Sequence, residues 1–143
     1  MEKPPINILI VEDNLAHLKL TEHVLKRNKV NGRFFVVRDG QEALDFLYRR
    51  NAYTDPSLAP TPDLVLLDLN LPKRDGREVL KIIKEDPDLR NIPVVIVSTS
   101  DREEDIAYAY QTGAVAYISK STGLDKYNVE LGGVAQYARS KGT

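Results

Sequence analysis

Four short apolar runs in the sequence each end in a polar side chain that could take part in chemistry. These junctions are Glu12-Asp13 after residues 6–11, Asp68 after residues 64–67, Ser98 closing residues 94–98, and Lys120 after residues 116–119. Asp68 is the most informative of them, because a carboxylate at the end of a buried strand is costly unless something compensates its charge. The repetition predicts that these polar groups meet at one site.

The three carboxylates indicate a metal site. Carboxylates that face one another repel, so the site is expected to attract a hard divalent cation. Mg²⁺ suits the set, because it binds one or two carboxylates together with a backbone carbonyl and retained waters. The expected ligands are Asp13 and Asp68 directly, Glu12 through water, and the backbone carbonyl of Asn70.

The same residues favour phosphoryl transfer. With a metal bound, Asp68 keeps one oxygen that can attack phosphorus as a nucleophile. Such a transfer requires neutralisation of the phosphoryl oxygens, which the metal and the ammonium of Lys120 could provide. The hydroxyl of Ser98 could donate a hydrogen bond to the attached group. The expected product is an aspartyl phosphate.

The elements that must position these residues alternate between strands and helices. The expected strands are residues 6–11, 34–37, 64–68, 94–98 and 116–119. Their continuous apolar character is typical of strands covered on both faces. The apolar positions of the expected helices fall within residues 15–25, 43–47, 79–83, 101–113 and 124–138. The last helix is expected to bury one apolar stripe, formed by Leu124, Tyr127, Leu131, Val134 and Ala138. Gly132 and Gly133 lie inside this helix and should weaken it by roughly 1 kcal/mol each.

This alternation predicts an α/β fold, a doubly wound five-stranded parallel sheet with five helices on its two faces. Such sheets bind ligands beyond the carboxyl ends of their strands, where the polar residues lie. The length of 143 residues fits a single domain over residues 1–143. Residues 51–62 contain three prolines and are expected to form a loop.

The composition excludes several classes of protein. The 20 basic and 21 acidic side chains nearly balance, so no basic surface for nucleic acid is expected. The absence of cysteine excludes disulfides and thiolate zinc sites. No apolar stretch approaches the ~18 residues of a membrane span. Residues 1–5 contain no signal-peptide core, which favours a cytoplasmic protein.

Taken together, these motifs resemble the receiver domain of two-component response regulators, from Ile8 to Tyr137. The matching residues are Glu12-Asp13, Asp68 within residues 67–72, Asp75-Gly76, Ser98, Tyr117 and Lys120. The resemblance implies a flavodoxin-like fold and a histidine kinase that phosphorylates Asp68. It also implies that Ser98 and Tyr117 swing inward on phosphorylation and alter the face made by the fourth helix, fifth strand and fifth helix.

A narrower resemblance concerns the receivers that partner bacterial phytochrome kinases. It is carried by residues 51–62, residues 71–80 and Ser98-Thr99-Ser100. It implies a receiver without an effector domain that forms homodimers through the same face. The family usually has proline after the active-site lysine, but here Ser121 follows Lys120. A cis bond before serine would cost ~2.5–4 kcal/mol, which counts against one at this position.

The main alternative is a magnesium-dependent phosphohydrolase that uses Asp68 as its nucleophile. Such an enzyme needs a second carboxylate two residues later as general acid, and Asn70 at that position cannot transfer a proton usefully. The same objection applies to a nucleic-acid enzyme with a paired aspartate site. We therefore expect a non-enzymatic receiver with at most slow autodephosphorylation. Its downstream partner, either another protein or a second phosphorelay histidine, stays open.

Overall fold

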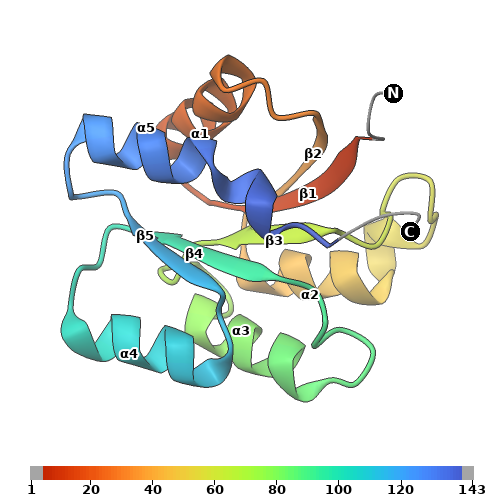
Figure 1. The fold of residues 1–143 in the computed structure, drawn as a ribbon. Coiled ribbons are helices and arrows are strands. Elements are labelled where there is room, and N and C mark those ends of the chain that lie inside the picture. Colours follow the sequence, from red (N-terminus) through yellow and green to blue (C-terminus); the bar gives the residue numbers. More distant parts are fainter. Residues whose placement is uncertain (1–4, 140–143) are drawn as a thin grey trace.

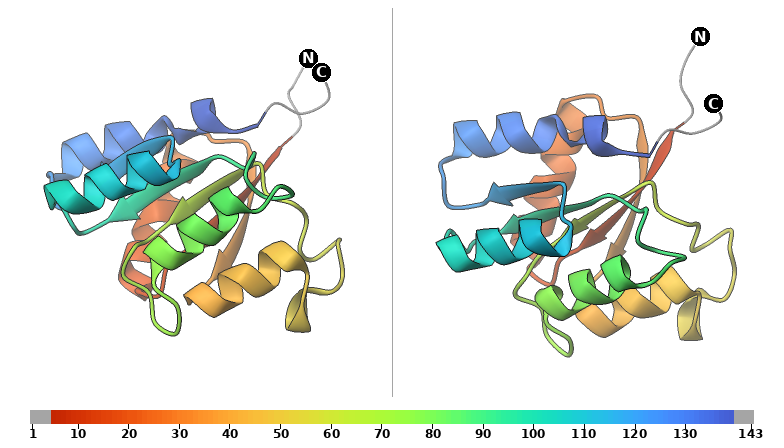
Figure 2. Two further views of the ribbon diagram at one scale, coloured as in Figure 1. Left: turned by 90° about the horizontal axis from the view of Figure 1, so that it is seen from below. Right: turned by 60° about the horizontal axis from the view of Figure 1, so that its bottom comes forward.

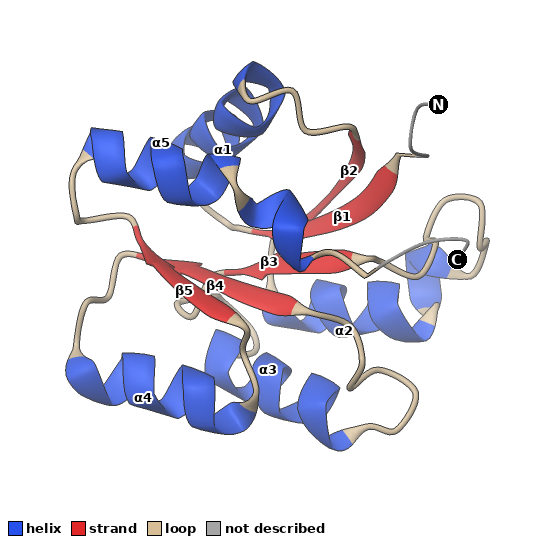
Figure 3. Ribbon diagram, in the orientation of Figure 1, coloured by secondary structure: helices blue, strands red, loops and turns tan. Residues whose placement is uncertain are grey.

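The computed structural model describes residues 5–139 and has three layers, a parallel sheet between two layers of helices (Figure 1). The strands are β1 (Ile6–Val11), β2 (Gly32–Val37), β3 (Leu64–Leu67), β4 (Val94–Ser98) and β5 (Ala116–Ser119). All neighbouring pairs are parallel, and the strand order is β2-β1-β3-β4-β5. The predicted doubly wound five-stranded sheet is confirmed (Figure 3).

The helices divide between the two faces of the sheet. One face is covered by α1 (Leu15–Arg27) and α5 (Leu124–Gly132), and the other by α2 (Gly40–Tyr48), α3 (Gly76–Glu85) and α4 (Glu103–Thr112). Figure 2 shows the last three side by side. Two short 3-10 helices, η1 (Asn51–Tyr53) and η2 (Val134–Tyr137), complete the elements. The five predicted helices are therefore present.

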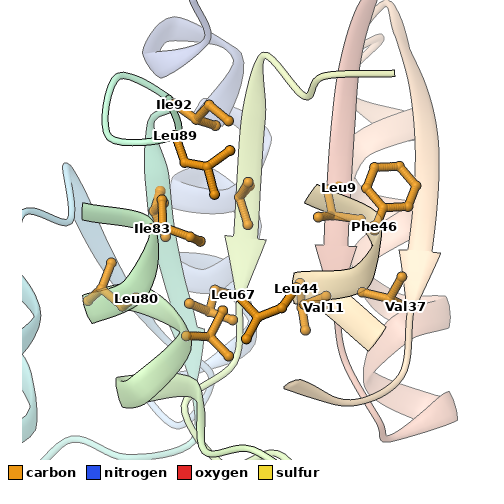
Figure 4. Close-up of a cluster of buried hydrophobic side chains, with 14 of the residues drawn as sticks. Leu9, Val11, Val37, Leu44, Phe46, Leu67, Leu80, Ile83, Leu89 and Ile92 are labelled. Atoms are coloured by element: carbon orange, nitrogen blue, oxygen red, sulfur yellow. The ribbon is translucent and has the colours of Figure 1, made fainter. Parts of the chain in front are cut away.

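Burial on both faces makes the sheet a rigid support. Every residue of β3 and β4 is buried, and a separate apolar cluster fills each side of the sheet. Figure 4 shows the cluster beneath α2 and α3, where Leu9 from the sheet lies beside Phe46 from α2, and Leu67 lies between Leu44 from α2 and Leu80 from α3. Each fully buried side chain of this size stabilises the fold by about 1.5–3 kcal/mol. The strand ends are thereby held in fixed positions.

The last helix is shorter than its apolar stripe predicts. α5 ends at Gly132, and the chain continues as η2 instead of reaching Ala138 in one helix. A Cβ atom on Gly132 would lie 2.5 Å from Cγ of Asn28, so any larger residue would have to displace the Asn28 side chain where α5 crosses the end of α1. Gly133 then follows with its backbone outside the helix. Leu124, expected on the buried stripe, is 61% exposed.

Other boundaries differ by a few residues. β2 begins at Gly32, which pairs with Ile6, and not at Phe34. β3 ends at Leu67, so Asp68 is the first residue beyond the strand, although its N–H still donates to the carbonyl of Val11. Residues 51–62 contain η1, in which the ring of Tyr53 packs edge-on against Phe46 with the two ring centroids 5.2 Å apart.

Two further findings bear on the expectations. No helix among residues 5–139 has the length and apolar character that crossing a membrane requires. No cis peptide bond occurs in this part of the chain, so the bond after Lys120 is trans. Residues 1–4, most of the segment expected to lack a signal-peptide core, lie outside the described residues.

Candidate functional site

The register of β1 and β3 brings the carboxylates together. Val11 pairs with Leu67, so Glu12 and Asp68 leave the sheet side by side. Oxygen atoms of Glu12, Asp13 and Asp68 all lie within 4.8 Å of one another. Glu12 and Asp68 are buried, whereas Asp13 is exposed at the edge. The structure thus assembles the acidic cluster that the sequence predicts at the carboxyl edge of the sheet.

Lys120 is the cation of this cluster. Its ammonium forms an ion pair with Oε1 of Glu12 and donates to Oδ2 of Asp68 at 3.3 Å. The side chain is only 7% exposed. The backbone N–H of Lys120 donates to the carbonyl of Ser98 at 2.8 Å, which anchors the residue to the end of β4. Two buried carboxylates therefore share one buried ammonium, and the exposed carboxylate of Asp13 lies beside them.

The surroundings of the acidic cluster shift the pKa of Glu12. Burial raises the pKa of Glu12, the nearby charge of Asp68 raises it further, and the ammonium of Lys120 opposes both effects. The donor set consists of carboxylate oxygens, which are the ligands that Mg²⁺ and similar hard cations prefer. A divalent cation would relieve the repulsion among the carboxylates. The residues present fit such an ion.

The turn after β3 fixes the orientation of Asp68. The N–H of Asn70 donates to Oδ1 of Asp68 at 3.1 Å. The N–H of Gly76 donates to the carbonyl of Leu69 at 2.8 Å. A Cβ atom on Gly76 would lie 2.1 Å from the carbonyl oxygen of Asp68, so only glycine permits this close approach. The expected metal ligand Asn70 thus lies in a turn closed directly against Asp68.

Ser98 and Tyr117 are joined to each other through Ser100. Ser98 is fully buried, and its Oγ accepts a hydrogen bond from the N–H of Ser100 at 3.2 Å. The hydroxyl of Tyr117 donates to the carbonyl of Ser100 at 2.8 Å. The ring of Tyr117 packs against the core cluster, and burial raises its pKa. The tyrosine therefore lies inward in this structure.

His17 is a neighbour of the site that sequence reasoning missed. Its Nδ1 lies 3.2 Å from the ammonium of Lys120 and 3.9 Å from Oε1 of Glu12. Burial and the charge of Lys120 both lower its pKa, which favours a neutral ring that accepts from the lysine. The sequence feature that could have indicated this contact is the position of His17 on α1, about one helical turn after Asp13.

A second charged cluster, also missed, lies beside the site between α3 and α4. Arg77 donates from Nη2 to Oδ1 of Asp105 at 2.8 Å and from Nη1 to Oδ1 of Asp75 at 3.0 Å. The hydroxyl of Ser100 donates to Oδ2 of Asp105 at 2.5 Å. Arg77, Ser100 and Asp105 line part of an open pocket of about 310 Å³ that also reaches Asn70.

Comparison with known proteins agrees with this geometry. The model of the response regulator receiver domain family matches residues 8–130. Response regulator Rcp1 of Synechocystis sp. (strain PCC 6803) is 45% identical over 121 residues, which are 85% of this chain and 80% of that protein.

Two solved structures are also similar. The crystal structure of the Mn²⁺-bound form of Rcp1 has a TM-score of 0.82 and 41% identity, covering 92% of this chain and 93% of that one. The phosphorylated cyanobacterial phytochrome response regulator RcpA has a TM-score of 0.84 and 42% identity, covering 97% of each chain. By its matched residues, its fold and its relatives, this chain belongs to the response regulator receiver domain family.

Proposed function

We propose that this protein accepts a phosphoryl group on Asp68 from a histidine kinase. One observation carries the proposal: Asp68 lies among two other carboxylates with the ammonium of Lys120 donating to its Oδ2. In the transfer, an oxygen of Asp68 forms a bond to phosphorus as the bond between phosphorus and the donor histidine breaks. The electron pair stays on the histidine nitrogen, which takes a proton from solvent.

The residues around Asp68 have distinct tasks in this proposal. Lys120 neutralises charge on the transferred oxygens, as its position against Oδ2 suits it to do. Asp13 and Asp68 would hold Mg²⁺ directly, Glu12 through water, and Asn70 through its carbonyl. When bound, Mg²⁺ supplies further neutralisation of the phosphoryl oxygens. The buried hydroxyl of Ser98 donates a hydrogen bond to the attached group.

Tyr117 reports the phosphorylation state. A Ser98 hydroxyl engaged by the phosphoryl group and an inward Tyr117 favour each other, because both are hydrogen-bonded to Ser100. The change alters the face made by α4, β5 and α5, where Tyr110 and Val115 are exposed. This surface is the proposed contact for a second copy of the chain or a downstream protein.

The similarity to phytochrome response regulators supports a phytochrome-type kinase as the donor, and hence a role in light signalling in the cytoplasm. A receiver domain can act through contacts with other proteins or by passing its phosphoryl group to another histidine. No feature of the described site favours the phosphohydrolase alternative, because position 70 carries an amide and the N–H of Asn70 is directed at Asp68.

The test is labelling with acetyl phosphate and Mg²⁺. We expect one acid-stable, base-labile phosphoryl group per chain, which is lost in Asp68→Asn and kept in Asp125→Asn, a matched control on exposed α5. Multiple turnover of the donor without a labelled protein would instead indicate a hydrolase. Sedimentation with and without beryllium fluoride, a phosphoryl mimic, tests the dimer, and a monomer under both conditions contradicts it.

A further inference from the structure

All three hydrogen-bonding groups of Ser100 are engaged. Its N–H donates to Oγ of Ser98, its carbonyl accepts from the hydroxyl of Tyr117, and its own hydroxyl donates to Oδ2 of Asp105. Two of these bonds reach the residues proposed to change with phosphorylation. The third leads away from them to α4. The position of Ser100 is therefore tied to the position of Asp105.

Asp105 is itself held by Arg77. The carboxylate lies in the first turn of α4 and its side chain is only 8% exposed. A buried carboxylate is costly unless it is paired and hydrogen-bonded. Arg77 meets this need by donating from Nε and Nη2 to Oδ1 at 3.1 and 2.8 Å, while Ser100 occupies Oδ2. The pKa of Asp105 is lowered by the hydroxyl of Ser100 and by Arg77.

Arg77 links this arrangement to the turn that follows Asp68. Nη1 of Arg77 pairs with Asp75, the N-cap of α3, and the N–H of Arg77 also donates to that carboxylate at 3.1 Å. The planar guanidinium thus joins α3 and α4 in a fixed geometry, which a flexible ammonium would not reproduce. The chain of contacts runs from the β3–α3 turn through Arg77, Asp105 and Ser100 to Tyr117.

We propose that Arg77 and Asp105 are positioning residues of the switch: they fix the Ser100 carbonyl as the acceptor for Tyr117 and so favour its inward arrangement. This inference rests on the proposed function, because it assigns the inward arrangement to the phosphorylated state. Coupling between two sites is reciprocal. A change that releases Ser100 should therefore weaken binding of a phosphoryl mimic at Asp68, although the side-chain hydrogen bonds of Arg77 and Asp105 go to each other, to Asp75 and to Ser100 and not to Asp68.

The variants are chosen to separate positioning from folding. Asp105→Asn keeps the shape of the side chain and removes the charge that holds Arg77. Arg77→Lys keeps the positive charge but loses the planar guanidinium and its several fixed N–H donors. Glu104→Gln is the matched control, because it removes a carboxylate from the same turn of α4, where Glu104 pairs only with the exposed Arg102. Thermal unfolding of each variant shows that it is folded.

The first readout needs no phosphorylation. The ring signals of Tyr117 in ¹³C-tyrosine-labelled protein, assigned by Tyr117→Phe, report whether the ring lies inward. We expect Asp105→Asn and Arg77→Lys to shift these signals toward those of an exposed tyrosine, and Glu104→Gln to leave them unchanged. Signals that stay at the wild-type position in both Arg77 and Asp105 variants, or an equal shift in the control, would overturn the proposal.

The second readout is titration with beryllium fluoride in the presence of Mg²⁺. We expect the apparent affinity to fall about 5-fold or more in Asp105→Asn and to be unchanged in Glu104→Gln. Equal affinities for wild type and Asp105→Asn would contradict the coupling. If wild type neither binds the mimic nor takes label at Asp68, the proposed function fails, while the Tyr117 signals still decide whether Arg77 and Asp105 position the ring.

Discussion

Two charged clusters lie side by side at the carboxyl edge of the sheet and differ in how their charges are balanced. The acidic site consists of Glu12, Asp13, Asp68 and Lys120, and the Arg77 cluster of Asp75, Arg77, Ser100 and Asp105. In the acidic site the ammonium of Lys120 pairs with the two buried carboxylates of Glu12 and Asp68, and the exposed carboxylate of Asp13 lies beside them. In the Arg77 cluster the forked guanidinium and a hydroxyl occupy both oxygens of Asp105.

Burial alone does not separate these two clusters. Asp68 and Asp105 are nearly equally buried, at 7% and 6% exposure. What differs is the set of partners, because a divalent cation would relieve the repulsion in the acidic site, whereas both oxygens of Asp105 already accept hydrogen bonds. A buried cluster with an excess of carboxylates thus points to a binding site, and a hydrogen-bonded cluster beside it is suited to hold the site in place.

The largest expected effect comes from breaking the balanced cluster. Arg77→Met leaves the buried carboxylate of Asp105 without its cation, so we expect a loss of about 2–3 kcal/mol in the free energy of unfolding, allowing for the partial exposure of Arg77. Urea unfolding measures it. The double variant Arg77→Met/Asp105→Asn should recover most of this loss. A single-variant loss below about 0.5 kcal/mol would show that the pair does not hold α3 and α4 together.

A somewhat smaller effect is expected from reducing charge in the acidic site. Asp13→Asn removes a proposed metal ligand and one source of repulsion. The apparent affinity for Mg²⁺ should fall by about 10-fold, or about 1.4 kcal/mol, while stability without metal is unchanged or slightly higher. The dependence of the unfolding temperature on Mg²⁺ concentration measures both. Asp125→Asn should behave as wild type, and an Asp13→Asn protein with full metal affinity would remove Asp13 from the ligand set.

The contrast between the two clusters also explains which of them could be predicted from the sequence. The acidic site follows from local patterns, since each of its residues comes directly after an apolar strand and parallel strands end at the same edge. The Arg77 cluster has no such signal. Asp105 closes a run of three acids that reads as a solvated helix start, and its partner lies 28 residues away. The pairing of Arg77 with Asp105 follows only from the packing of α3 against α4 in the tertiary structure.

Two smaller contacts between distant residues were likewise not predictable from local sequence patterns. His17 reads as a polar residue on a helix surface, and its contact with Lys120 joins residues 103 positions apart. The apolar stripe of the last helix predicts burial of Tyr127, Leu131 and Val134 correctly. It does not show that Gly132 meets Asn28, which is a property of the crossing between α1 and α5. Local periodicity predicts elements, whereas close approaches between elements come from the tertiary structure.

The smallest expected effect is a pair of opposite pH dependences. The pKa of Asp105 is lowered, so its contribution to stability is present above the ordinary pKa of about 3.9 and is lost as the pH falls through the folded value. The pKa of Glu12 is raised, so the folded protein loses stability as the pH rises above about 4.3 toward the folded value. The two carboxyl groups therefore change the free energy of unfolding with pH in opposite directions.

Urea unfolding between pH 3 and pH 7 with a chelator present tests this, with each substitution compared with wild type. The stability advantage of wild type over Asp105→Asn should shrink as the pH falls. The stability of Glu12→Gln relative to wild type should rise with the pH, because the amide avoids ionisation in a buried position beside Asp68. If the stability difference, taken each time as variant minus wild type, changed with pH in the same direction for both substitutions, Lys120 would compensate Glu12 as fully as Arg77 compensates Asp105. The acidic site would then not be over-charged without its cation.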